Sequence, residues 1–89
     1  MAGAQEEYLE KMTKYLPVLR AALKISQREL AEKVGVTRQS MMNIETKRSP
    51  LQWPTYLALV FLFQQNEDTK KLLYSLELFD DKMVDMNYE

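Results

Sequence analysis

Apolar side chains recur at helical spacing along most of this chain, which predicts an all-α protein. Between residues 6 and 23 a large apolar residue returns about once per helical turn, as in an amphipathic helix with one buried face. Pro17 interrupts this pattern, so we expect a kink there, or a short extra N-terminal helix followed by a first core helix. Residues 1–4 are expected to fray. The chain has no Asn-Gly or Asp-Gly hairpin signal and no long strand-like alternation.

Two short helices with clear boundaries follow in the middle of the chain. Ser26 opens a Ser-x-x-Glu capping box, which predicts a helix over residues 27–34. Gly35 is expected to end that helix with a positive φ. Thr37 is a suitable N-cap for the next helix, which we expect over residues 38–45.

A fourth helix is predicted after a polar loop at residues 47–52. It begins near Trp53, with Pro54 in the first turn, where proline is tolerated. Apolar residues then lie on every side of the helix, so we expect it to be buried all round. Three of its aromatic residues are therefore assigned to the core and not to a stacking platform for single strands: Tyr56, Phe61 and Phe63.

A fifth helix is predicted over about residues 66–80, opened by Asn66, and the acidic residues 80–89 are expected to fray. One helix face cannot hold all of its large apolar residues equally. They complete the monomer core, by folding back over the first helix, or form a dimer seam, and we favour both roles. The four residues are Leu72, Leu73, Leu76 and Phe79.

Composition excludes several classes of protein. The chain has 89 residues, enough for a single domain over 1–89, and 46% of them are hydrophobic. It has no Cys and no His, so disulfides, thiol chemistry and the commonest general base and metal ligand are excluded. Two glycines cannot build a phosphate-binding loop, and no apolar run reaches the ~18 residues of a membrane span. We expect a cytoplasmic binding protein that is not an enzyme, with no signal peptide, metal, cofactor, membrane contact or small-molecule ligand.

Charge is unevenly distributed along the chain, although the net charge is only −1. Residues 11–53 carry nine of the twelve basic residues and three acidic ones. Residues 1–10 and 54–89 are both acidic overall. A basic middle with acidic flanks is compatible with a polyanionic partner at one face, and equally with an unevenly charged solvated surface.

Residues 27–45 meet the packing demands of a helix-turn-helix. Ala31 is small enough to lie under a steep helix crossing, and Gly35 supplies the positive φ that the turn needs. Met41 and Ile44 lie three residues apart and can both be buried on the second helix. The outer face of that helix is polar: Thr37, Arg38, Gln39 and Asn43.

Residues 25–40 resemble, at nearly every position, the helix-turn-helix of bacterial regulators of the phage-repressor and Cro type, the Xre-like family. With the loop at 44–50 and the apolar fourth helix, the resemblance covers about residues 16–63. It implies a five-helix phage-repressor-like domain that binds double-stranded DNA as a homodimer and regulates transcription, most simply as a repressor that occludes a promoter. Lys24 and Lys47 stand where family members usually carry Gly. Either these lysines adopt a positive φ or the two turns differ locally.

The resemblance also implies roles for individual residues. Arg20 and Glu45 are similar to a buried family pair that ties the first helix to the third. Some residues of the third helix would read base edges in the major groove: Arg38, Gln39 and Asn43. Others would contact phosphates, which positions the protein without specifying sequence: Gln27, Thr37, Ser40, Lys47 and Arg48.

A protein-interaction module is the competing interpretation. An antitoxin-like or antirepressor partner would use the acidic C-terminal region against another protein, and its helix-turn-helix would be purely structural. The polar outer face of the third helix favours DNA binding.

Overall fold

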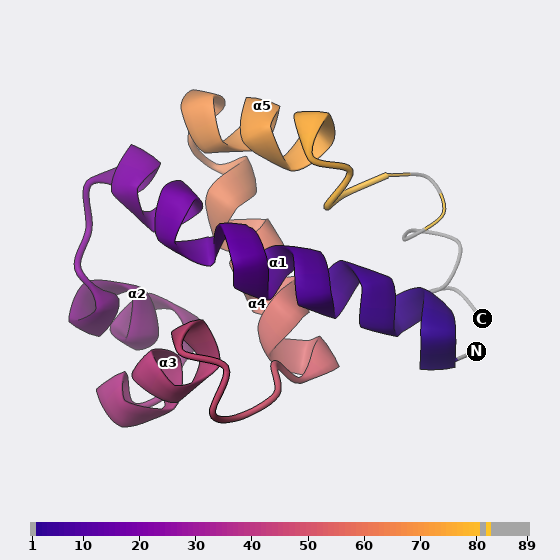
Figure 1. The fold of residues 1–89 in the computed structure, drawn as a ribbon. Helices are drawn as coiled ribbons and strands as arrows, with labels where there is room; N and C mark the ends of the chain where they lie inside the picture. The colour runs from indigo at the N-terminus through magenta and orange to yellow at the C-terminus, as the bar shows by residue number, and fades with distance from the viewer. Residues whose placement is uncertain (1, 81, 83–89) are drawn as a thin grey trace.

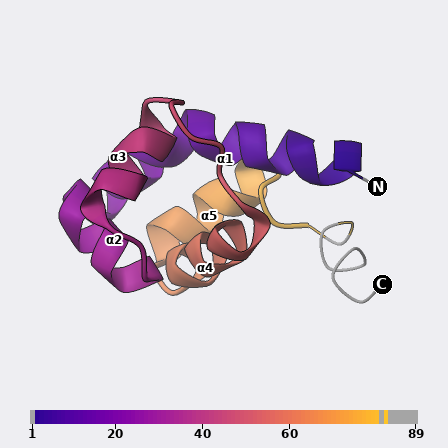
Figure 2. The same cartoon turned by 90° about the horizontal axis from the view of Figure 1, so that it is seen from below.

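Five helices make up the described part of this computed structural model, which covers residues 2–80 and 82. No strand occurs within that part, so the all-α prediction is confirmed there. In chain order the helices are α1 (Ala2–Leu23), α2 (Gln27–Val34), α3 (Arg38–Glu45), α4 (Trp53–Gln64) and α5 (Glu67–Ser75). The α2–α3 pair lies at one end of the molecule, and the N-terminal half of α1 extends to the other end (Figures 1 and 2). The long α1 also packs against α3, α4 and α5.

Helix α1 runs without a break through Pro17, so the expected division into a lead-in helix and a core helix is wrong. Its buried residues lie on both sides of the proline and share one face: Tyr8, Met12, Leu16 and Leu19. Pro17 itself is exposed, so water can reach the carbonyl that loses its amide donor. Because both halves pack into one core, the packing holds the helix together across the missing hydrogen bond. Helix α1 already begins at Ala2, which also corrects the expected fraying of residues 2–4.

Local capping signals set the limits of α2 and α3 as predicted. The Ser26 hydroxyl accepts from the Glu29 amide at 3.1 Å, and the Glu29 carboxylate accepts from the Ser26 amide at 3.3 Å. Gly35 follows α2 with φ 84°. The Thr37 hydroxyl accepts from the Ser40 amide at 3.0 Å and caps α3. These contacts lie within a few residues of each other in sequence, which explains why the pattern alone located both helices.

Helices α1, α3 and α5 end in the same kind of turn, with a non-glycine residue in the left-handed region. Lys24, Lys47 and Glu77 have φ values of 59°, 63° and 57°. In each turn two successive amides donate to carbonyls three and five residues back, which satisfies the end of the helix. The left-handed conformation costs a non-glycine residue about 1–2 kcal/mol. Of the two alternatives for Lys24 and Lys47, the structure therefore has the positive φ.

One hydrophobic cluster joins all five helices. Tyr56 and Phe63 of α4 are fully buried in it, as predicted. Phe61 is 68% exposed, so its assignment to the core is wrong. Helix α4 packs against α1, α2 and α5, and Phe61 lies on the side that none of them covers. Helix α4 is therefore not buried on every side, although it is apolar, because its neighbours leave one side exposed to solvent.

The chain turns back into the core after α5, which ends at Ser75 and not near residue 80. Leu78 is completely buried, although the sequence pattern did not indicate it. The Tyr56 hydroxyl donates to the Leu78 carbonyl. The Tyr8 hydroxyl donates to Asp80 Oδ1 at 2.6 Å. These contacts bind the segment after α5 to both α1 and α4.

Among the described residues, none of the helices has both the length and the apolar character needed to cross a bilayer. The expected fraying of residues 80–89 lies outside the described residues, apart from positions 80 and 82.

Candidate nucleic-acid interface

Helices α2 and α3 pack directly on each other and are joined by a short turn. Ala31 is 1% exposed, as expected for a small residue in a helix contact. Met41 and Ile44 anchor α3 in the core, with 0% and 6% exposure. Both were predicted from their spacing. Burying this side of α3 leaves its opposite side facing solvent.

The solvent-facing side of α3 carries the residues predicted to read bases. Arg38 and Gln39 are exposed, and Asn43 is half-buried one turn further on. Gln39 Nε2 donates to Asn43 Oδ1 at 3.1 Å, so the two amides hold each other in position. This contact does not use the Gln39 carbonyl oxygen or the Asn43 amide nitrogen. The side therefore offers a guanidinium and a fixed pair of amides, the groups that recognise base edges.

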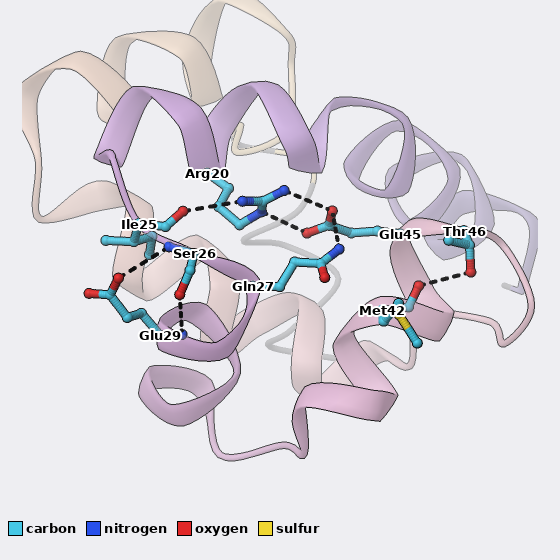
Figure 3. A network of polar contacts seen from close by, with 8 residues as sticks. All are labelled: Arg20, Ile25, Ser26, Gln27, Glu29, Met42, Glu45 and Thr46. Carbon is cyan, nitrogen blue, oxygen red and sulfur yellow. Dashed lines mark hydrogen bonds and ion pairs between the residues drawn. The ribbon is translucent and has the colours of Figure 1, made fainter.

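A polar network behind this surface ties α1 to α3 (Figure 3). Arg20 Nε donates to Glu45 Oε2 at 3.0 Å, and Arg20 Nη2 donates to Glu45 Oε1 at 3.3 Å. Arg20 Nη1 also donates to the Ile25 carbonyl at 3.2 Å. The Glu45 side chain is only 5% exposed and that of Arg20 24%. The structure therefore brings together the pair that the resemblance implied.

Gln27 is a third donor in this network, which the sequence did not indicate. Its Nε2 donates to Glu45 Oε1 at 3.0 Å (Figure 3). The predicted phosphate ligand thus has its side-chain nitrogen directed toward Glu45. Its backbone amide belongs to the first turn of α2, where amides have no partner within the helix. That amide is the group through which Gln27 can bind an anion.

An open hollow lies at the start of α2, and arginines from three helices line it. Its lining consists of Arg20, Ser26, Gln27, Arg28 and Arg38. Arg20 is held by Glu45, whereas Arg28 is paired only with Glu32, at 3.6 Å, in an exposed contact. Because Glu45 and the Ile25 carbonyl engage the Arg20 guanidinium, the groups here that suit a phosphate are Arg28 and Arg38 beside the N-terminus of α2. The sequence did not indicate Arg28 as part of a site, because only the packing of α1, α2 and α3 brings the arginines together.

The loop after α3 places two further cations at the surface. Lys47 and Arg48 are exposed, and no carboxylate of the described residues lies within ion-pair distance of either. Their backbone amides donate to carbonyls of α3, at 3.1 and 2.8 Å. Lys47 and Arg48 can therefore bind an anion through their side chains and not through these amides.

The apolar residues predicted for a dimer seam lie deeper in the molecule than the sequence indicated. Leu73 is 0% exposed and belongs to the monomer core, so it offers no surface to a partner. The other three residues are partly buried and pack against that core: Leu72, Leu76 and Phe79. The large exposed apolar residues of the described chain are Val18, Phe61 and Tyr74.

Comparisons of the chain with models of protein families, with curated proteins and with solved structures found no match. The function of this protein is therefore inferred from the exposed side of α3 and the cations around it.

Proposed function

We propose that this protein binds duplex DNA sequence-specifically by inserting α3 into the major groove, and that it thereby regulates transcription. The observation that carries the proposal is the exposed polar side of α3, flanked by the arginine hollow and by the two loop cations. The order of five helices and the directly packed α2–α3 pair are compatible with a phage-repressor-like fold. Repression by occlusion of a promoter is the simplest form of regulation for a domain of this size.

Base recognition is assigned to three residues of α3. The Arg38 guanidinium can bind the O6 and N7 atoms of guanine in a bidentate manner. Gln39 and Asn43 offer amide groups for adenine, and their mutual hydrogen bond orients both in advance. Side chains that are oriented before binding lose less conformational entropy on association.

Phosphate contacts are assigned to the groups around this side of α3. The hollow at the start of α2 takes one phosphate, through its arginines and the Gln27 amide. Thr37 and Ser40 are exposed near the N-terminus of α3, and their hydroxyls can donate to the same strand. Lys47 and Arg48 would contact a second stretch of backbone. These contacts fix how α3 lies in the groove.

We also propose that the protein acts as a two-fold dimer through α5 and the segment after it. Two-fold operators require a two-fold protein, with recognition helices ~34 Å apart. The contributing residues are the half-buried Leu72, Leu76 and Phe79 together with Tyr74, which is 50% exposed. Tyr74 packs edge-on against Phe79, with ring centroids 5.7 Å apart, so the two rings form one aromatic surface.

A second candidate function is binding to another protein, and a separate observation favours it. Phe61 is 68% exposed on α4, which is unusual for a phenylalanine in a small domain. A partner that covers Phe61 would leave the α3 surface free, as in an antitoxin-like or antirepressor complex.

Selection of bound sequences from a random duplex pool tests the proposal. We expect enrichment of a two-fold sequence with half-sites about one DNA turn apart. Binding to the selected duplex should weaken steeply with salt, by ~0.9 log unit per log unit of salt for each phosphate neutralised. A pool that stays random, or an affinity that does not respond to salt, would refute the proposal and favour the protein-binding alternative.

A further inference from the structure

A groove outside the α2–α3 pair separates the N-terminal half of α1 from the loop that follows α3. One wall is formed by successive turns of α1: Glu6, Leu9, Glu10, Thr13 and Lys14. The other wall is formed by residues 47–51. Lys14 thus lines the same groove as Lys47 and Arg48, although more than thirty residues separate it from them in sequence.

The three cations of this groove have no acidic partner among the described residues. Lys14, Lys47 and Arg48 are exposed, and within residues 2–80 and 82 no carboxylate forms an ion pair with any of them. The Lys14 ammonium lies 5.2 Å from the centroid of the neighbouring Tyr15 ring, a contact that does not neutralise its charge. Unpaired cations brought together from two elements create a local positive potential, and that potential attracts an anion.

Acidic residues limit this positive region along α1. Glu10 and Glu6 lie one and two turns before Lys14 on the same wall, about 6 Å and 12 Å away along the helix axis. The positive charge of the α1 wall therefore lies at Lys14, and the sign of the charge along this wall changes within about two turns. A polyanion over the groove is attracted at one end and repelled at the other.

The floor of the groove is apolar and continuous with the core. Leu51 is only 3% exposed and belongs to the core, and Leu9 packs against the same core. The rim carries charged side chains, whereas much of the remaining lining is apolar. The cations of the rim can contact an anionic backbone that passes over the mouth of the groove.

We infer that the DNA-binding surface extends across this groove onto α1, where Lys14 contacts a backbone phosphate beside those held by Lys47 and Arg48. Glu10 and Glu6 mark the limit of this surface by repelling the backbone beyond it. The inference rests on the proposed DNA binding and adds to it a residue of α1, outside the helix-turn-helix. Because the Lys47 and Arg48 amides already donate to α3, these two residues contact the backbone through their side chains.

The salt dependence of duplex binding tests the inference in the full chain. Lys14→Gln should lower the slope of log affinity against log salt by ~0.9, as Lys47→Gln should. The matched control is Lys71→Gln on α5, an exposed lysine that should leave the slope unchanged. Lys14→Arg keeps the charge and should retain the slope. Thermal melting of each variant shows that the fold is kept.

The outcomes separate this inference from the proposed function. If Lys47→Gln lowers the slope and Lys14→Gln does not, DNA binding stands and the extension onto α1 is wrong. If the wild type binds no duplex, both proposals are wrong. If Lys14→Gln then fails to bind a protein that the wild type binds, the groove is the site of that protein.

The acidic limit has a test of its own. Glu10→Gln should raise affinity for the duplex at low salt, because it removes repulsion at the edge of the surface. Glu7→Gln, an exposed residue of the same helix that does not line the groove, is its matched control. Equal effects of the two substitutions would mean that affinity depends only on the overall charge of the protein. Glu10 would then not mark the edge of the DNA-binding surface.

Discussion

Replacing Glu45 with alanine is expected to destabilise this protein far more than the same change at an exposed acid. Glu45 is 5% exposed and accepts hydrogen bonds from Arg20 and Gln27, so one carboxylate serves three donor groups. Its removal leaves the Arg20 guanidinium without its charged partner, with only the Ile25 carbonyl still accepting from it. Breaking one side of a buried pair typically costs 3–5 kcal/mol, because the remaining charge is uncompensated.

The partial exposure of Arg20 sets the magnitude at the lower end of that range. Its side chain is 24% exposed, so water can solvate part of the guanidinium once Glu45 is gone. We therefore expect a loss of about 3 kcal/mol, which is a fall in Tm of roughly 12–24 °C for a domain of this size. Glu32 is the control, because it is 69% exposed and pairs with Arg28 one turn away. Glu32→Ala should cost only about 0.4 kcal/mol, or a few degrees.

Urea and thermal unfolding, followed by far-ultraviolet circular dichroism, measure both losses. Trp53 fluorescence gives a second signal, because its ring stacks on Tyr56 with centroids 4.8 Å apart. A double-mutant cycle with Arg20→Met isolates the pair from the Gln27 contact. Equal Tm values for the Glu45 and Glu32 variants would refute the reasoning, since they would mean that water solvates both acids equally well.

Three further predictions concern specificity, pH and assembly. Arg38→Ala should cost ~1–3 kcal/mol of binding free energy at one base-pair position and relax the base preference there, whereas Lys47→Ala should lower the affinity for all sequences about equally. Competition assays with single-base variants of the duplex distinguish the two patterns. A uniform loss of affinity in both variants would make Arg38 a phosphate contact. Burial first, and then the hydrogen bond to Asp80, raises the pKa of Tyr8 above its ordinary value of about 10. The unfolded chain therefore ionises first, so stability is kept below about pH 10 and falls as pH rises above it. Burial also raises the pKa of Tyr56, so Tyr8→Phe should make this fall in unfolding free energy less steep without abolishing it, and an unchanged profile would contradict the assignment. Sedimentation should find the wild type dimeric at micromolar concentration and Tyr74→Glu monomeric, and a wild type that is monomeric yet binds single half-sites would rule the dimer out.

Local sequence determined the α2–α3 pair. The Ser26 capping box, the positive φ at Gly35 and the Thr37 cap each involve atoms only a few residues apart, so the residue pattern is sufficient to predict them. The buried side of α3 followed from the spacing of Met41 and Ile44, because a rigid helix places residues three apart on one side. Because that side of α3 is buried, its other side is exposed and carries the candidate base-reading residues.

Tertiary packing decided the features for which the local pattern was ambiguous. Pro17 by itself indicates a kink or a division, and α1 is not divided because both of its halves are buried in one core. Phe61 has the same local surroundings as Phe63, but only the arrangement of α1, α2 and α5 around α4 leaves one exposed and the other buried. Leu78 becomes core only because the chain turns back after α5.

The charged sites also include some that the sequence indicated and others that only the tertiary structure reveals. The pairing of Arg20 with Glu45 was implied by resemblance, whereas the place of Gln27 beside them required the packed helices. The arginine hollow and the groove at Lys14 join residues from separate elements, and their spacing in sequence carries no signal of proximity. Hydrogen bonds within a turn depend on a few dihedral angles of neighbouring residues. Contacts between helices depend instead on the total burial of the whole chain, which no single segment contains.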